Sequence, residues 1–576
     1  MITKERPISR DCHMNQSHGY RTDAELAIAR QLGVFQENAA KMWRGHEKEA
    51  VIALIRTLDT SAVIRLQGVD AREGEATGGQ PTHRIMTLGA AAALRPFLTK
   101  IEGQPSGVPW GPMRPDVAQF AYSYLRCCGQ LTHLSRMAAL ERQGLATSSF
   151  ASASHVIIRV PNSAPEFSLQ HAIRSTANRA LPDTADNDLG ELGRKRLRKR
   201  MKSYVDAPGG WFIRYDNDQE IVSTYLARAR CYGRGYLEAE ALPEDIKIGD
   251  RTFGEWTYAC DQALGRILCH IDFVGLLQEK RPKVHASNVL TLFARRHDID
   301  EVWQETGLPT GRVLPTMQAL TLGSENLEDW EKAHEVPCAI YVDLGKDHVL
   351  LPCFGTLTNP YFALFRHLRS TYKHDWDRGV DRREAIFRSD LAKAFPEPDF
   401  LVPSHGFQLR RTDGSKLTDV DAIVLDRRHG TLVLVQLKWH DVFGFSLPER
   451  ESRRRNITKA NEWTERVISW VDGRTSAQLA RALGLDAKAA DSPPLLYVVA
   501  RYAARFTGET GQDPRAFWIG WPEILHVLHD NPGGDILSQI PRLVLDHQAR
   551  FTLQEEQCFE FRFPDLSTDL HILPES

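Results

Sequence analysis

The chain has 576 residues, of which 42% are hydrophobic and 25% are charged, a composition typical of soluble globular proteins. This length suits roughly two to four domains with sizeable cores. Its 72 basic and 74 acidic side chains nearly cancel, so net charge neither favours nor excludes a polyanionic partner, and any nucleic-acid site must be a local patch.

The nine cysteines are scattered and include no C-x-x-C pair, which argues against a disulfide framework and against a structural zinc site. The first residues are polar and lack the apolar segment of a secretory signal. No apolar run approaches the about 18 residues of a membrane span. We therefore expect a cytoplasmic protein without a membrane partner.

The N-terminal part is predicted to be mainly helical. Residues 1–20 are polar and indicate a disordered N-terminus, whereas residues 21–375 indicate a helical region of one or two subdomains. In the stretch 116–143, apolar residues recur at steps of three and four, as in a helix packed on a core. The stretch 252–280 has the same pattern, and 337–353 resembles a hairpin.

A strongly basic segment interrupts this region. The stretch 181–203 is acidic first, and then seven of the nine residues from Arg194 to Lys202 are Lys or Arg. Such a run is typical of a solvated face or a mobile loop, and contact with phosphate is the alternative. We expect a basic loop near residues 180–203.

The pattern changes near residue 376, where we place the start of a C-terminal domain, residues 376–576. Alternating helix and strand signals follow, which indicate an α/β core of one mixed sheet flanked by helices. The expected helices lie at 381–395 and 449–473, and the expected strands at 400–411, on either side of the turn at 427–430 and at 495–501. The stretch 516–528 is expected to be a strand that leads into a helix.

Two apolar strands flank a polar turn in LTDVDAIVLDRRHGTLVLVQLKWHD, residues 417–441. If RRHG is the turn, Asp421 faces Gln436 and Asp419 faces Lys438. Because side chains alternate along a strand, all four polar groups then lie on one face at the open end of the hairpin. A shift of register by one residue would separate them.

A carboxylate beside an amide oxygen suits Mg²⁺, which prefers oxygen ligands. A lysine next to the ion can orient or activate water, or stabilise charge that develops on a phosphate. These residues therefore predict metal-dependent hydrolysis of phosphodiesters. The alternative is structural, with Asp419 and Lys438 as a cross-strand salt bridge and Gln436 as a satisfied amide.

This arrangement resembles the PD-(D/E)xK superfamily, the restriction-endonuclease-like nucleases, in which an Asp opens one strand and an acid-x-Lys follows on the next. Here Asp421 is followed after fourteen residues by Gln436-x-Lys438, which is similar to the Gln variant of Mrr-type restriction enzymes. The resemblance covers about residues 380–525 and implies the α/β fold of that superfamily.

The resemblance also implies roles. Asp421 matches the metal-binding Asp, Gln436 the second acidic position and Lys438 the catalytic Lys. Glu384 matches an acidic residue that many members carry on the preceding helix as a further ligand, and a solvent-facing glutamate in a first helical turn is the alternative. Because Gln436 replaces a carboxylate, we expect weaker metal binding.

Basic residues follow the Lys strand, on a helix that flanks the active-site cleft in this fold. Phosphate contact is the functional interpretation and a solvated face is the alternative. The residues are Arg453, Arg454, Arg455 and Lys459.

The expected function is that of a Mg²⁺-dependent endonuclease, with Mn²⁺ as an alternative ion and DNA as substrate, although the sequence leaves RNA open. Restriction or antiviral defence is the natural context, and the N-terminal region would sense, target or oligomerise. The alternative is a catalytically inactive nuclease-fold protein that binds nucleic acid or a partner, and Gln436 favours it.

Overall fold

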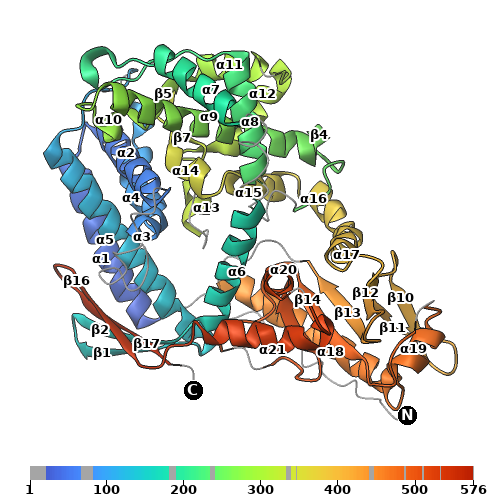
Figure 1. Cartoon of the computed structure of the whole chain (residues 1–576). Helices are drawn as coiled ribbons and strands as arrows, with labels where there is room; N and C mark the ends of the chain where they lie inside the picture. The colour runs from blue at the N-terminus through green and yellow to red at the C-terminus, as the bar shows by residue number, and fades with distance from the viewer. Residues whose placement is uncertain are drawn as a thin grey trace, which may run out of the picture.

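The computed structural model describes residues 21–574 except 67–81, 105, 181–189, 234–235, 237–240, 306, 333–338, 346, 440–446, 486–487, 509–510 and 532 (Figure 1). Residues 1–20, which the sequence predicts to be disordered, lie outside this set. None of the helices described is long and apolar enough to cross a membrane.

The first part of the chain is a helical bundle, drawn in blue in Figure 1. A capping box begins α1, where Thr22 and Glu25 each accept a hydrogen bond from the other's backbone N–H. Helices α3 and α5 pack closely at Gly129, where a Cβ would lie 1.9 Å from the Ile85 carbonyl oxygen. The bundle contains α1 (Asp23–Met42), α2 (Glu47–Leu66), α3 (Thr82–Leu88), α4 (Ala90–Leu98), η3 (Ile101–Gly103), α5 (Pro115–Ala139) and η4 (Leu140–Gln143).

A four-stranded sheet joins this bundle to the end of the chain (Figure 1). Its order is β1-β2-β17-β16, in which β2 and β17 are parallel and the outer pairs antiparallel. Its apolar face packs against α1 and α5. The strands are β1 (Thr147–Ser152), β2 (His155–Pro161), β16 (Gln557–Arg562) and β17 (Ser567–Leu573).

The middle of the chain is mainly helical, as the sequence predicts. It holds a sheet of order β5-β8-β7-β6, in which β7 and β8 form the hairpin expected near 337–353. Its elements are α7 (Gly190–Tyr204), η5 (Pro208–Gly210), α8 (Gln219–Gly233), β3 (Lys247–Ile248), β4 (Arg251–Thr252), α9 (Phe253–Lys280), α10 (Ala286–Val289), β5 (Leu292–Arg295), α11 (Arg296–Glu305), α12 (Thr310–Leu320), β6 (Thr321–Leu322), α13 (Leu327–Lys332), β7 (Tyr341–Asp343), β8 (His348–Leu351), α14 (Cys353–Thr358), α15 (Phe362–Thr371) and α16 (Lys373–Val380).

The C-terminal α/β unit is built on one mixed sheet of order β15-β14-β13-β12-β9. Strands β13, β14 and β15 are parallel, and β12 is antiparallel to β13 and to β9. The elements are α17 (Arg383–Ala394), β9 (Phe400–Leu401), β10 (Phe407–Arg410), β11 (Lys416–Val420), β12 (Ala422–Asp426), β13 (Leu432–Lys438), α18 (Leu447–Val471), α19 (Ser476–Ala482), β14 (Leu495–Ala500), β15 (Phe517–Gly520), α20 (Trp521–Asp530) and α21 (Ile536–Ala549).

Helices cover both faces of this sheet, which explains why β12 and β13 are apolar along almost their whole length. Ala422 and Val424 point into a core shared with α17, α20 and α21. Ile423 and Leu425 point into the opposite core, which α18 and α19 cover. The predicted mixed sheet with flanking helices is thus present.

Two local predictions are wrong. The strand expected over 400–411 is split, because β9 joins the main sheet whereas β10 pairs with β11 in a separate two-stranded sheet. The basic loop expected near 180–203 is helical from Gly190 onward, in α7, and residues 181–189 lie outside the described set. Several of its charges are paired, for example Lys195 with Glu191 at 2.6 Å and Lys202 with Glu279 at 3.2 Å.

Helix α6 (Ala164–Ala180) leaves the N-terminal sheet and packs against α20 and α21 of the α/β unit, as Figure 1 shows. In the other direction, β16 and β17 leave that unit for the N-terminal sheet. The predicted division at residue 376 does not anticipate this exchange, because the sequence places residues 557–573 in the C-terminal domain.

Candidate active site

The carboxyl end of β13 and the start of β12 bring three polar side chains to one face of the sheet. The hairpin register is as predicted, with Leu425 opposite Leu432 and Ile423 opposite Leu434. Alternation along each strand then places Asp421, Gln436 and Lys438 on the face that α18 covers. They meet where the apolar core on that face ends.

Asp421 is the most constrained of these groups, with 8% of its surface exposed. Its Oδ2 accepts a hydrogen bond from the Leu437 backbone N–H at 2.7 Å and another from the Gln436 amide. Burial and the nearby Glu384 carboxylate raise the pKa of Asp421 to about 6, although the Leu437 N–H, Lys438 and Gln436 oppose this shift. A cation beside Asp421 would lower the free energy needed to ionise this buried carboxyl group.

Lys438 ends β13 and lines a small hollow together with Ile457 of α18 and Phe506. Burial and the neighbouring Lys459 lower the pKa of Lys438, whereas Asp421 and Glu384 act in the opposite direction. Lys438 therefore holds its proton less firmly than an exposed lysine does.

Glu384 approaches the site from α17, in the first turn of that helix. Its carboxylate pairs with Arg388 one turn later, and 53% of its side chain is exposed. It contributes to the pKa values of both Asp421 and Lys438, so it is close enough to act on them electrostatically. The structure thus brings Asp421, Gln436 and Lys438 together, and places Glu384 near enough to influence the pKa values of Asp421 and Lys438.

The basic residues predicted to bind nucleic acid lie on α18. Arg455 and Lys459 are exposed, and Lys459 is near enough to Lys438 to lower its pKa. The backbone of Arg453 and Arg454 is helical, but their side chains lie outside the described set. Lys459 is therefore the member of this group that the structure connects with the site.

Asp419 does not face Lys438, contrary to the sequence expectation. Strand β11 leaves the main sheet and pairs with β10, which places Asp419 opposite Gln408. The Asp419 carboxylate instead pairs with Lys416 at 2.5 Å and is half-exposed. The structural alternative, a cross-strand salt bridge between Asp419 and Lys438, is excluded by the same geometry.

These residues fit a hard divalent cation. The carboxylates of Asp421 and Glu384 offer oxygen ligands of the kind that Mg²⁺ prefers. Gln436 directs its Nε2 toward Asp421, and the same amide turned over would present its oxygen, since the two orientations occupy the same space. The donor set therefore has two carboxylates and one amide, one charge fewer than a set of three carboxylates.

Comparisons with family models, with curated proteins and with solved structures give no match.

Two arginines at the site are absent from the sequence prediction. Arg388 Nε donates to the Asp421 carbonyl oxygen at 2.6 Å, and its spacing of four residues from Glu384 on one helix is a signal that could have revealed it. Arg501 follows β14 directly, as Lys438 ends the neighbouring parallel strand β13, and its backbone N–H donates to the Lys438 carbonyl oxygen at 2.8 Å. Its guanidinium is paired with Asp390 at 2.7 Å.

Proposed function

We propose that the C-terminal α/β unit is a Mg²⁺-dependent nuclease that hydrolyses phosphodiester bonds in DNA, with Asp421, Gln436, Lys438 and Glu384 as its site. The observation that carries this proposal is the meeting of a buried carboxylate, an amide and a lysine at the end of the β12–β13 hairpin, where Asp421 accepts hydrogen bonds from the Gln436 amide and from the Leu437 N–H. A structural salt bridge stabilises both charged forms, which lowers the pKa of the acid and raises that of the base. At this site the pKa of Asp421 is raised and that of Lys438 is lowered, a combination typical of functional sites.

Each side chain has a role in this reaction. Asp421, Glu384 and the Gln436 amide would hold the ion, which when bound supplies a Lewis acid for a phosphate oxygen. Lys438 Nζ donates to a non-bridging oxygen and stabilises the charge that develops there. Lys438 would also help to orient the attacking water.

The surroundings of the site suit a nucleic acid. Arg455 and Lys459 lie exposed on α18, the helix that covers the same face of the sheet as Asp421 and Lys438. Positive side chains at such a place position a phosphate backbone irrespective of sequence. Mn²⁺ would serve as an alternative ion.

The architecture agrees with the resemblance to PD-(D/E)xK nucleases, which implies one mixed sheet with helices on both faces. The α/β unit has that arrangement, with its polar site at the end of the central hairpin. Restriction or antiviral defence in the cytoplasm is the context we propose, with the N-terminal region as a sensing, targeting or oligomerising part.

Cleavage of supercoiled plasmid with Mg²⁺ or Mn²⁺ tests this function. Asp421→Ala and Lys438→Ala should each lower the rate by roughly 100-fold or more, because one removes a metal ligand and the other a charge that stabilises the transition state. Asp419→Ala is the matched control, since its carboxylate is nearby in sequence but paired with Lys416. It should cleave within about twofold of the wild type.

A catalytically inactive protein that binds nucleic acid is the second candidate, and the amide at Gln436 favours it. In that case the wild type binds DNA or RNA, as measured by fluorescence anisotropy, yet cleaves neither with any divalent ion. Equal inertness of the wild type, Asp421→Ala and Lys438→Ala on plasmid, single-stranded DNA and RNA would refute the nuclease.

A further inference from the structure

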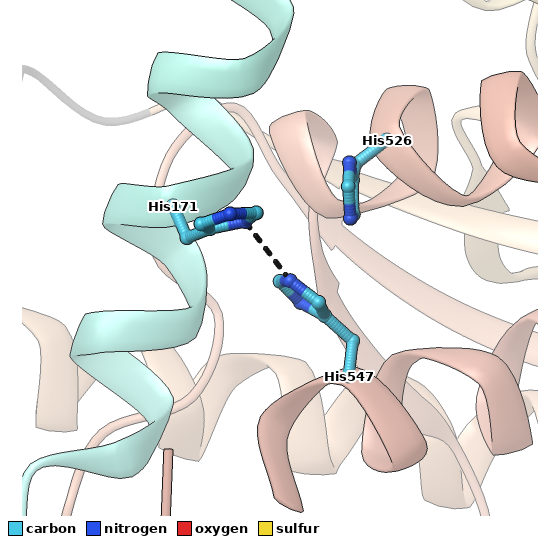
Figure 2. Close-up of side chains that lie close together, drawn as sticks. All are labelled: His171, His526 and His547. Atoms are coloured by element: carbon cyan, nitrogen blue, oxygen red, sulfur yellow. Dashed lines mark hydrogen bonds between the residues drawn. The ribbon is translucent and has the colours of Figure 1, made fainter. Parts of the chain in front are cut away.

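Three histidines from distant parts of the chain meet where α6 packs against the α/β unit. His171 lies on α6, His526 on α20 and His547 on α21, and Figure 2 shows their rings converging from three helices. Each ring offers a nitrogen, and the three nitrogens lie within 4.8 Å of one another. We propose that His171, His526 and His547 form a transition-metal site, for which Zn²⁺ is the best-suited ion.

The distance between the first two ligands is close to what such an ion requires. His547 Nε2 and His171 Nδ1 are 3.1 Å apart and share a hydrogen bond, drawn as a dashed line in Figure 2. Tetrahedral Zn²⁺ with bonds of about 2.0–2.1 Å separates two ligand nitrogens by roughly 3.3 Å. An ion can therefore replace the shared proton, which is released to solvent, with small movements of the rings.

Each buried ring is held by a second partner, as is usual for metal-binding histidines. The Ser168 hydroxyl lies 2.9 Å from His547 Nδ1, which leaves Nε2 for the centre of the cluster. The Asp530 carboxylate lies 3.5 Å from His526 Nε2, which directs the opposite nitrogen, Nδ1, away from that acid.

The chemistry of the three ligands also favours a transition metal. Imidazole rings of this kind suit Zn²⁺ among the common ions. Phe551 packs against His171 and His547 and forms an apolar wall beside the cluster.

The cluster has an open side. His526 and His547 are buried, with 6% and 5% of their surface exposed, whereas His171 is exposed. An ion can therefore enter past His171, and a water can occupy the fourth position that three protein ligands leave. The bound ion would tie α6 of the N-terminal half to α20 and α21 of the α/β unit.

Two other groups in the described part of the chain lack these features. In the first, Asp426 already accepts hydrogen bonds from the backbone of Arg428 and His429 and from the His429 ring, which shapes the β12–β13 turn. The second group, His297, Asp298 and Glu301, is exposed on α11.

The test is Zn²⁺ binding by the full-length protein after chelator treatment, measured as bound metal per chain and by calorimetric titration. We expect one tight equivalent in the wild type, and an affinity about 100-fold lower in His171→Ala, whose exposed ring can be removed without disturbing a core. His526→Gln and His547→Gln should behave likewise. His374→Ala is the matched control, because that ring is 91% exposed elsewhere, and it should bind as the wild type does.

Two further measurements make the result decisive. Co²⁺ in place of Zn²⁺ should give the visible absorption of a four-coordinate nitrogen site in the wild type and in Asp421→Ala, which separates this site from the proposed nuclease site. Zn²⁺ should also raise the melting temperature of the wild type more than that of His171→Ala. The proposal is overturned if the wild type binds no Zn²⁺ at micromolar concentration, if His171→Ala binds as tightly as the wild type, or if Asp421→Ala is the variant that loses the ion.

Discussion

Asp421 shows how a single carboxylate can be made responsive to a cation. It is buried, it accepts a backbone N–H from Leu437, and its pKa is raised to about 6 by burial and by Glu384. Ionisation of a buried carboxylate costs free energy near neutral pH, and a bound divalent ion offsets that cost. Gln436 is the neighbour that sets how strongly the ion is held.

Gln436→Glu should strengthen metal binding, because it restores a negative charge beside Asp421. We expect the Mg²⁺ concentration for half-maximal cleavage to fall about tenfold, which corresponds to ~1.4 kcal/mol. The measurement is the plasmid cleavage rate as a function of Mg²⁺ concentration. Gln408→Glu, on β10 opposite Asp419, is the control and should leave the Mg²⁺ requirement unchanged. An unchanged requirement in Gln436→Glu would count against Gln436 as a ligand.

At the residue scale, the sequence predicted the pairing of β12 with β13 correctly but not the partner of Asp419, which lies before β12. The RRHG turn between two apolar runs predicted Ile423 opposite Leu434, and this placed Asp421 beside Gln436. Asp419 lies two residues beyond, where the chain turns into β11, and a pairing rule extended past the end of a strand has no physical basis there.

Asp59 illustrates, at the scale of elements, how a buried acid joins separate helices. It lies on α2, accepts hydrogen bonds from Thr291 Oγ1 at 2.6 Å and from the Phe354 N–H at 2.8 Å, and thereby caps the start of α14. Burial raises the pKa of Asp59 to about 7, although these hydrogen bonds and Arg56 oppose the shift.

Stability should therefore depend on pH through Asp59. The folded protein retains a proton that the unfolded chain releases above about pH 4, so this contribution is complete below pH 4 and is lost as the pH rises to about 7. In Asp59→Asn, the decrease in melting temperature from pH 5 to pH 7.5 should be smaller than in the wild type. Asp298→Asn, at an exposed position, should follow the wild type. Parallel profiles for all three proteins would contradict this prediction.

Helices and strands whose apolar residues recur at regular spacing could be predicted from the sequence, whereas the highly charged helix α7 could not. The helices α5 and α9 and the strands β13 and β14 follow from apolar spacing. Helix α7 was mistaken for a loop because its charge density hid two apolar anchors, Leu197 and Met201, which are four residues apart and buried.

At the scale of the whole molecule, the sequence does not indicate that β16 and β17 join the N-terminal sheet or that α6 packs against the α/β unit. The partner of β17 is β2, about 410 residues earlier, and α6 packs on helices more than 340 residues later. Alternation shows that a strand has a buried face but not which distant strand lies beside it. The histidine cluster was missed for the same reason, since its members share no local spacing.

The closing strand should contribute strongly to stability. Leu570 on β17 is fully buried against α1 and α5, so Leu570→Ala should lower the free energy of unfolding of the N-terminal part by about 2–5 kcal/mol. Leu192→Ala on α7, where the side chain is 73% exposed, should change it by less than about 0.5 kcal/mol. Thermal unfolding followed by circular dichroism compares the two variants. A loss of stability in Leu570→Ala as small as that in Leu192→Ala would contradict this prediction.

Because β2 and β17 are neighbouring parallel strands, the long stretch of chain between them leaves the N-terminal sheet and returns to it. A protease that cuts once near residue 380 would produce two fragments that remain interlocked, since each contributes one of these neighbouring strands. The fragments should therefore co-purify and melt together, unlike domains connected in series by a linker. The α/β unit is thus connected to the N-terminal part at two places, through α6 and through the chain that leads from α21 into β16.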